Sequence, residues 1–205
     1  MSSCFTSFES VEQPTVTGTS GRFEFDQTAV PGTSGMTSRR CLAPVADLGK
    51  GLGNFGLNDF GMELALAEAR KALDEGEIAV GAVLMRGDQV VWADHNRREQ
   101  LKDPTAHAEM LCMRHGAEKL GDWRLQGCTL YVTLEPCPMC AGAMVMARVG
   151  KCVYGAEDLE KGCCGSVYDL PADPALGSVG TWEQVSEAEV GECREILQAS
   201  FRRGK

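Results

Sequence analysis

The chain lacks the features that direct a protein to a membrane or hold it on a polyanion. No stretch of its 205 residues approaches the roughly 18 to 20 consecutive apolar residues that a membrane-spanning helix requires. The N-terminal segment MSSCFTSFES contains no basic region and no apolar core, so we expect neither secretion nor membrane association. Positive charge is also scarce, because 20 Lys and Arg residues stand against 29 Asp and Glu residues, a formal net charge of -9. Any surface for nucleic acid would therefore have to be local.

What the chain does contain is typical of one globular domain that follows a tail. Hydrophobic residues make up 43% of the chain and charged residues 24%, which is enough apolar surface for a buried core. Residues 1–56 are rich in Ser, Thr and Gly and show no regular apolar spacing, so we expect a disordered tail before a domain at 57–205. The 10 cysteines, without a secretory signal, favour reduced thiols and a cytoplasmic location.

Apolar spacing in the domain alternates between helical and strand periods. Asn58 and Asp59 are suitable caps for a first helix, which Gly76 would end. Pro136 suits the first turn of a later helix. The expected strands are 78–85, 89–95, 128–134 and 150–156, and the expected helices are 60–73, 106–120, 135–149 and 186–201. This alternation predicts an α/β fold in which helices cover a mostly buried sheet.

The strongest chemical signal is a pair of short segments, HAE at 107–109 and PCPMC at 136–140. Zinc in proteins prefers Cys thiolates and His nitrogens, and a catalytic zinc has three protein ligands and one open position. Two cysteines three residues apart at the start of a helix can reach one ion, and the helix N-terminus favours their thiolate forms. We therefore predict that His107, Cys137 and Cys140 hold one zinc ion.

Glu109 follows the predicted His ligand by two residues and needs no place in the metal shell. Zinc lowers the pKa of its water to about 7, so hydroxide is available near neutral pH. Glu109 can accept the proton of that water, pass it to a ring nitrogen and protonate a departing amine. The pattern H-x-E followed by P-C-x-x-C is a signature of zinc-dependent base deaminases. The two segments together predict hydrolytic deamination with Glu109 as the catalytic residue.

Two other interpretations exist for parts of this pattern. A C-x-x-C pair alone is also typical of thioredoxin-like redox proteins. A structural zinc site would take a fourth thiolate, from Cys112, Cys128 or Cys152. Neither interpretation explains why a glutamate accompanies the histidine. The other histidines, His95 and His115, have no partner at ligand spacing, so we expect them at the surface or at helix ends.

Longer strings around these segments resemble one family. DPTAHAE at 103–109, TLEPCPMCAGAM at 133–144 and YGAEDLEKGCCGS at 154–166 are similar to the bacterial tRNA-specific adenosine deaminases of the cytidine deaminase-like superfamily. The resemblance extends from about Gly61 to the C-terminus. HAE and PCxxC alone would identify only the superfamily, whereas the longer strings look like the tRNA enzymes.

The resemblance implies a three-layer α/β/α fold with a central mixed sheet, a homodimer, and one zinc ion per subunit. The implied reaction is the conversion of adenosine to inosine at the wobble position, in the anticodon loop of an arginine tRNA. The family's base pocket would contain Asn96 and would be framed by the backbone at Ala108 and by Leu134 and Pro136. An asparagine amide offers both a donor and an acceptor to a purine edge.

Several positions depart from the family pattern. The segment 174–182 lacks the usual Asn-His pair, Glu157 replaces an arginine, and the C-terminus has Ser200 and Phe201 where the family has two aromatic residues. These changes fall where RNA would pass and leave the metal ligands intact. Two alternatives therefore stay open. One is deamination of a free nucleobase or nucleoside, such as guanine, cytosine or adenine, and the other is a non-catalytic zinc-stabilised interaction module.

Overall fold

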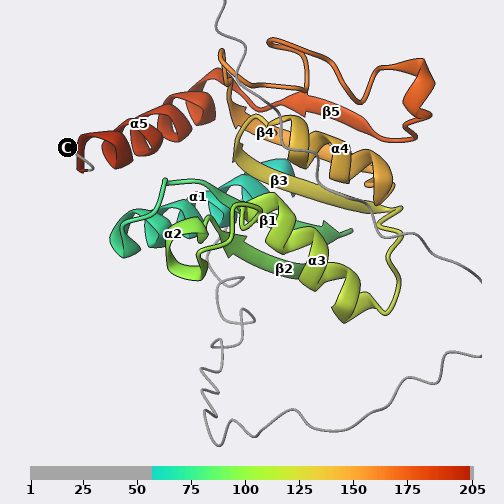
Figure 1. Ribbon diagram of the computed structural model, residues 1–205, viewed down its shortest axis with the longest axis horizontal. Coiled ribbons are helices and arrows are strands. Elements are labelled where there is room, and N and C mark those ends of the chain that lie inside the picture. Colours follow the sequence, from blue (N-terminus) through green and yellow to red (C-terminus); the bar gives the residue numbers. More distant parts are fainter. Residues whose placement is uncertain (1–56, 204–205) are drawn as a thin grey trace, which may run out of the picture. The chain divides into compact units, whose positions relative to one another are not determined.

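The computed structural model describes residues 57–203, which form a five-stranded mixed sheet with helices on both faces (Figure 1). The strand order is β2-β1-β3-β4-β5. Strand β1 pairs antiparallel with β2 and β3, whereas β4 runs parallel to both β3 and β5. The strands are β1 (Gly81–Arg86), β2 (Gln89–His95), β3 (Cys128–Leu134), β4 (Lys151–Ala156) and β5 (Thr181–Gln184). The disordered tail predicted for 1–56 lies outside the described residues.

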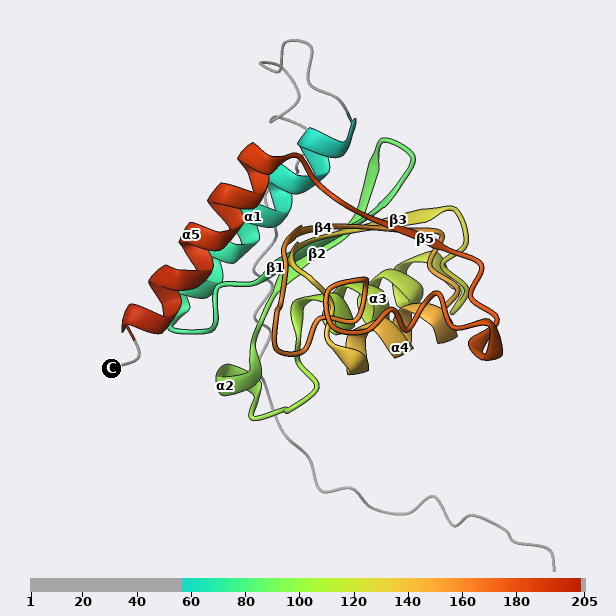
Figure 2. The same cartoon turned by 90° about the horizontal axis from the view of Figure 1, so that it is seen from above.

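The four long helices form two outer layers (Figure 2). Helices α1 (Leu57–Glu75) and α5 (Glu187–Arg203) lie on one face of the sheet, and α3 (Ala108–Leu120) and α4 (Pro138–Met146) lie on the other. The loops contain two single turns, α2 (Arg98–Leu101) and the 3-10 helix η2 (Pro174–Leu176). This arrangement confirms the predicted three-layer α/β/α fold with a central mixed sheet.

Alternation along the strands explains why both faces carry helices. Ala82 and Leu84 of β1 pack in the core beneath α3 and α4, whereas Val83 and Met85 pack in the core beneath α1 and α5. Successive strand residues point to opposite faces, so a strand that is apolar at every position is buried on both sides. The unbroken apolar run of β1 therefore specifies its central place in the sheet.

Some boundaries differ from the sequence predictions. Helix α4 begins at Pro138, so Pro136, which we expected in the first helical turn, precedes the helix. Proline is favoured at the first helical position because its missing N–H would have no partner there. The sequence did not predict β5, whose residues are mostly exposed at the sheet edge and show no buried alternation. In the part of the chain described here, no helix is long and apolar enough to cross a membrane.

Candidate metal centre and active site

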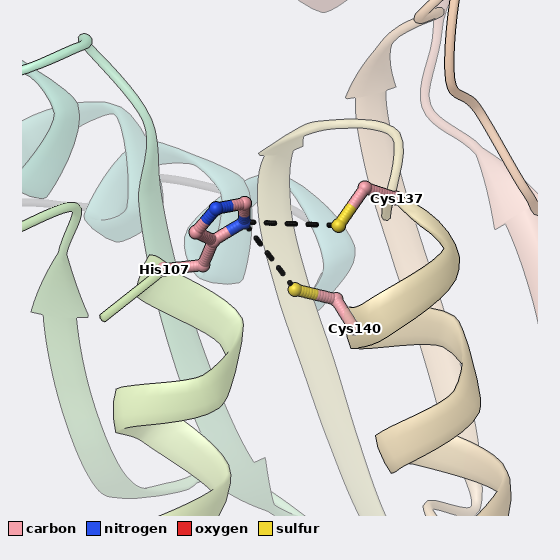
Figure 3. A group of neighbouring side chains, drawn as sticks. All are labelled: His107, Cys137 and Cys140. Atoms are coloured by element: carbon pink, nitrogen blue, oxygen red, sulfur yellow. Dashed lines mark hydrogen bonds between the residues drawn. The ribbon is translucent and has the colours of Figure 1, made fainter. Parts of the chain in front are cut away.

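Two helix N-termini on one face of the sheet bring the predicted zinc ligands together (Figure 3). His107 is the N-cap of α3, Cys137 is the N-cap of α4, and Cys140 lies in the first turn of α4. Helix α4 follows β3 in a parallel crossover, so it begins just beyond the carboxyl end of that strand. Ligands of α/β folds commonly bind at this end of the sheet.

The loop before α3 positions His107. Asp103 Oδ1 accepts hydrogen bonds from the backbone nitrogen and the hydroxyl of Thr105, at 2.8 and 2.7 Å. The backbone nitrogen of His107 donates to the carbonyl of Thr105 at 2.7 Å, and its carbonyl accepts from Leu111 at 3.0 Å, which begins the helix. The Asx turn formed by Asp103 mimics a backbone turn and changes the direction of the chain before His107. The DPTAH string therefore delivers His107 to the start of α3.

The three donor atoms are spaced as a tetrahedral zinc site requires. His107 Nδ1 lies 3.7 Å from Cys137 Sγ and 3.6 Å from Cys140 Sγ. Zinc–sulfur bonds near 2.3 Å and zinc–nitrogen bonds near 2.0 to 2.1 Å, at tetrahedral angles, place nitrogen and sulfur about 3.6 Å apart. All three donors lie within 4.8 Å of one another. These residues fit one zinc ion per chain, held by three protein ligands.

Within residues 57–203, no fourth thiolate joins the three donors, as a structural zinc site would require. Among the described residues, His107, Cys137 and Cys140 are the only His, Cys and carboxylate side chains that form such a cluster. The Cys112 thiol donates instead to the carbonyl of Ala82, at 3.1 Å, on the sheet side of α3. A shell with three protein ligands is typical of a catalytic zinc, which keeps one position for water or substrate.

Hydrogen bonds among the three donors shift their pKa values in different directions. A hydrogen bond from the Cys140 thiol, together with one from His107, lowers the pKa of Cys137 to about 4. The same hydrogen bond raises the pKa of the Cys140 thiol, and burial raises it further. The hydrogen bond to Cys137 also raises the pKa of His107. Since zinc ligands must be deprotonated, a bound divalent cation would displace these shared protons and stabilise both thiolates.

Glu109 lies beside the donors at an open cavity. The residue is only 3% exposed, and burial raises the pKa of its carboxyl group. A raised pKa brings a carboxyl group closer to the pH at which it can both accept and release a proton. The cavity has a volume of about 590 Å³, and His107, Glu109 and Cys137 are among its lining residues. A site of this size holds a small molecule or a single base that has left its stack.

Of the four residues predicted to form the base pocket, Asn96 and Leu134 line this cavity. Ala108 and Pro136 do not. Ala108 is the first residue of α3 and is fully buried in the core, and Pro136 is buried, with its carbonyl accepting a hydrogen bond from the backbone nitrogen of Cys163 at 2.9 Å. The structure therefore brings Asn96 and Leu134 to the same cavity as His107 and Cys137, and does not place Ala108 or Pro136 among the residues that line it.

The mouth of the cavity carries more acidic than basic side chains. Besides Glu109 and the buried Glu135, its acidic lining residues are Glu157, Asp158 and Glu160, and its basic ones are Arg98 and Lys161. A nucleic acid that enters here gains little from general phosphate attraction. The apolar lining residues Ile78, Leu159, Leu197 and Phe201 surround the same opening. A ligand at this opening therefore meets more acidic and apolar side chains than basic ones.

One residue that lines the cavity, Glu135, is a buried glutamate that we did not predict from the sequence as part of the site. Glu135 is 1% exposed and accepts hydrogen bonds from the backbone nitrogens of Cys164, Ser166 and Asp158, at 2.8, 3.1 and 3.2 Å. A side chain on Gly162 would collide with this carboxylate. The available signal was an acidic residue directly after the apolar strand TLYVTL, because a buried charge needs partners.

The prediction that His95 lies at the surface or at a helix end is wrong. The residue is 2% exposed at the end of β2. Its Nδ1 lies 3.0 Å from Glu68 Oε2, and its Nε2 lies 3.1 Å from Glu75 Oε2. Both carboxylates belong to α1, so His95 links the end of β2 to this helix through hydrogen bonds.

The fold and the donor set define the class of the protein. The family model described as the cytidine and deoxycytidylate deaminase zinc-binding region matches residues 57–156. This range includes all three zinc donors and Glu109. The centre is therefore that of a zinc-binding deaminase.

Individual relatives narrow this class to one family. The chain is 45% identical over 141 residues to the tRNA-specific adenosine deaminase of Bacillus subtilis, an alignment that covers 69% of this chain and 86% of that protein. It is 38% identical over 145 residues to the Aquifex aeolicus enzyme of the same name, covering 71% and 94%. A solved structure from a study of A-to-I editing by tRNA:A34 deaminases matches with a TM-score of 0.64 and 40% identity, covering 67% and 99%. The chain belongs to the family of tRNA-specific adenosine deaminases.

Proposed function

We propose that this chain hydrolyses the exocyclic amino group of adenosine at the wobble position of a tRNA, which yields inosine and releases ammonia. The observation that carries the proposal is the cluster of His107, Cys137 and Cys140, with Glu109 beside it at a cavity large enough for one base. The names of the relatives from Bacillus subtilis and Aquifex aeolicus support tRNA as the substrate.

Glu109 is the residue that we propose moves protons. When bound, zinc supplies an electrophile that lowers the pKa of water to about 7. A Glu109 carboxylate oxygen accepts one proton from the attacking water and delivers it to N1 of the adenine ring. Glu109 then takes the second proton, from the new hydroxyl on C6, and gives it to the departing amine as the C6–N bond breaks and the C6 carbonyl forms. Water contributes the new oxygen at C6 and ammonia leaves, so atoms and charge balance. The raised pKa of Glu109 suits a group that must both accept and return a proton.

Asn96 and Leu134 are proposed to hold the base, and the backbone at Ala108 and the residue Pro136 are proposed to help frame the same pocket. Leu134 offers an apolar contact for the purine ring, and the Asn96 amide offers hydrogen bonds to its edge. Because the reacting carbon must reach Glu109, the nucleotide has to leave its stack and enter the cavity. An anticodon loop presents such an unstacked base more readily than a duplex does.

We also propose an arginine tRNA as the substrate, a homodimer as the assembly, and the cytoplasm as the location. The resemblance of DPTAHAE and TLEPCPMCAGAM to the bacterial tRNA enzymes supports the first two. The 10 cysteines without a secretory signal support the third. Sedimentation equilibrium of the zinc-loaded chain tests the assembly, and twice the 22.0 kDa chain mass is the expected result.

The experiment that tests the function offers several substrates to the zinc-loaded protein in parallel. An anticodon stem-loop of arginine tRNA with adenosine at the wobble position is compared with free adenosine, guanine and cytosine. Inosine in the stem-loop, with no ammonia from the free compounds, is the expected outcome. Ammonia from a free base alone would contradict tRNA editing and favour a free-base deaminase.

The matched control replaces Glu109 by glutamine, which keeps the side-chain size and removes the proton acceptor. Zinc content should stay near one ion per chain, and stem-loop deamination should fall by about 100- to 10,000-fold. If wild-type protein and Glu109→Gln were equally inactive with every substrate yet equally stabilised by zinc, the non-catalytic interaction module would be the better description.

A further inference from the structure

Another buried glutamate, Glu77, contacts Asn96 from outside the cavity lining. Glu77 follows α1 in the loop that leads to β1, and it is 4% exposed. Its Oε2 accepts hydrogen bonds from Asn96 Nδ2 at 3.1 Å and from the backbone nitrogen of Glu99 at 3.2 Å. Its Oε1 accepts from the backbone nitrogen of Gln100 at 2.7 Å. One carboxylate therefore joins the loop after α1, the end of β2 and the start of α2.

The short helix α2 depends on this outside acceptor. It comprises only Arg98–Leu101, and its N-cap residue, Arg97, makes no side-chain capping hydrogen bond. The first backbone N–H groups of a helix have no partner within the helix, and a negative charge near them is stabilising. An aspartate at the N-cap would accept hydrogen bonds from these N–H groups. Glu77, which lies in another part of the chain, provides this acceptor instead. Arg98, which α2 contributes to the cavity lining, directly precedes the two residues whose backbone nitrogens donate to Glu77.

The carboxylate also determines which way the Asn96 amide points. The backbone nitrogen of Asn96 donates to the carbonyl of Val80 at 3.0 Å, which fixes the main chain. Only the amide nitrogen can donate to Glu77, so the side-chain oxygen must point elsewhere. Within the described part of the chain, no residue donates to Asn96 Oδ1, and no buried side-chain oxygen lacks a partner. The oxygen is therefore open to the cavity that Asn96 lines.

We propose that Glu77 is a positioning residue for base recognition, which orients the Asn96 amide so that its oxygen faces the edge of the substrate base. The inference rests on the proposed function, in which Asn96 contacts that base. An amide held in this orientation accepts a hydrogen bond from an amino or imino group of the base. If the amide were reversed, its NH2 group would face the amino or imino group of the base, and neither donor would have an acceptor. Unpaired polar groups of this kind allow a pocket to discriminate strongly between substrates.

The first test is the variant Glu77→Gln. A glutamine has one accepting and one donating side-chain atom, so it can pair with the Asn96 amide in either orientation. The single orientation that the carboxylate imposes is therefore lost, while the size of the side chain is kept. KM for the stem-loop should rise roughly 10- to 100-fold, the effect of one hydrogen bond to a charged group, with kcat and zinc content close to wild type. Glu118→Gln, the same change on the exposed surface of α3, should alter neither constant.

A double-mutant cycle separates orientation of Asn96 from a general role in the fold. If Glu77 acts through Asn96, then adding Glu77→Gln to Asn96→Ala should change kcat/KM by less than about threefold, because residues that act as one unit are not additive. Equal losses from Glu77→Gln in both backgrounds would overturn the inference. They would show that Glu77 only supports α2.

A readout that needs no turnover uses the side-chain amide of Asn96 in nitrogen-15 NMR spectra. In the wild-type protein the proton bonded to Glu77 should exchange slowly with solvent, and in Glu77→Gln this protection should fall at least tenfold. An unchanged amide signal would overturn the inference whatever the substrate is. If the wild-type protein deaminates a free base and not the stem-loop, the proposed function fails, and the cycle is run on that base.

Discussion

Replacing His95 by leucine is expected to destabilise the domain in a pH-dependent manner. Both ring nitrogens of this buried histidine lie at hydrogen-bond distance from carboxylates, and only the protonated imidazole can donate from both. Burial by itself lowers the pKa of His95, but the hydrogen bonds to Glu68 and Glu75 raise it above the ordinary value. Leucine fills a similar volume and can make neither bond.

The exposures of the two partners set the size of the effect. The Glu68 side chain is 11% exposed and that of Glu75 is 41% exposed, so the second bond is largely screened by water. A charge-assisted hydrogen bond contributes about 2 kcal/mol when buried, and roughly half of that when exposed. Lys71, 2.6 Å from Glu68, keeps that carboxylate paired in the variant. Loss of the two His95 hydrogen bonds should therefore lower the free energy of unfolding by about 3 kcal/mol, which corresponds to a Tm lower by roughly 6 to 12 °C.

The sign of the pH dependence follows from the direction of the pKa shift. A group whose pKa is raised in the folded state stabilises the fold fully below its unfolded pKa, near 6.5, and loses this contribution as pH rises through the folded value. The pKa of Glu68 is lowered: burial opposes this shift, and the hydrogen bond with His95 produces it. The contribution of Glu68 to the stability of the fold is therefore complete above about pH 4.5. The difference between wild type and His95→Leu should be largest near pH 6 and smaller at pH 9.

Urea denaturation of zinc-loaded protein at these two pH values measures the difference. His115→Leu is the control, since this histidine forms an exposed pair with Glu118 and should change the free energy of unfolding by less than about 1 kcal/mol. An equal loss at pH 6 and pH 9 for His95→Leu would refute the reasoning, because a neutral histidine would then explain the whole effect.

Other predictions concern the metal and the wall of the cavity. Cys137→Ala and His107→Ala should each lose about one equivalent of zinc in a colorimetric release assay. Glu109→Ala should keep its zinc and lose activity. If both ligand variants retained zinc, the assignment of His107 and Cys137 as ligands would be wrong. Glu135→Gln leaves at least one of three backbone N–H groups without an acceptor, so the free energy of unfolding should fall by about 1 to 3 kcal/mol. Hydrogen exchange should accelerate mainly in 158–166, and uniform acceleration throughout the sheet would contradict the local role of Glu135.

Much of the fold and of the metal centre could be predicted from the sequence because both depend on local patterns. Apolar runs of strand length and helical spacing determine the alternation of elements, and the long apolar runs of β1 and β3 determine that the sheet is covered on both faces. The HAE and PCPMC strings each begin a helix, and helices that follow strands start at one end of the sheet. His107, Cys137 and Cys140 therefore meet once the fold class is known.

Only the tertiary structure decided which polar residues are buried and what they contact. Glu135 holds residues 23 to 31 positions later in the chain, Glu77 holds Asn96 across 19 positions, and His95 reaches Glu68 across 27. Periodicity separates apolar from polar faces, but it does not distinguish a buried glutamate from a solvated one. That difference arises when distant backbone N–H groups and side chains converge on one carboxylate, because only then is the cost of burying the charge offset.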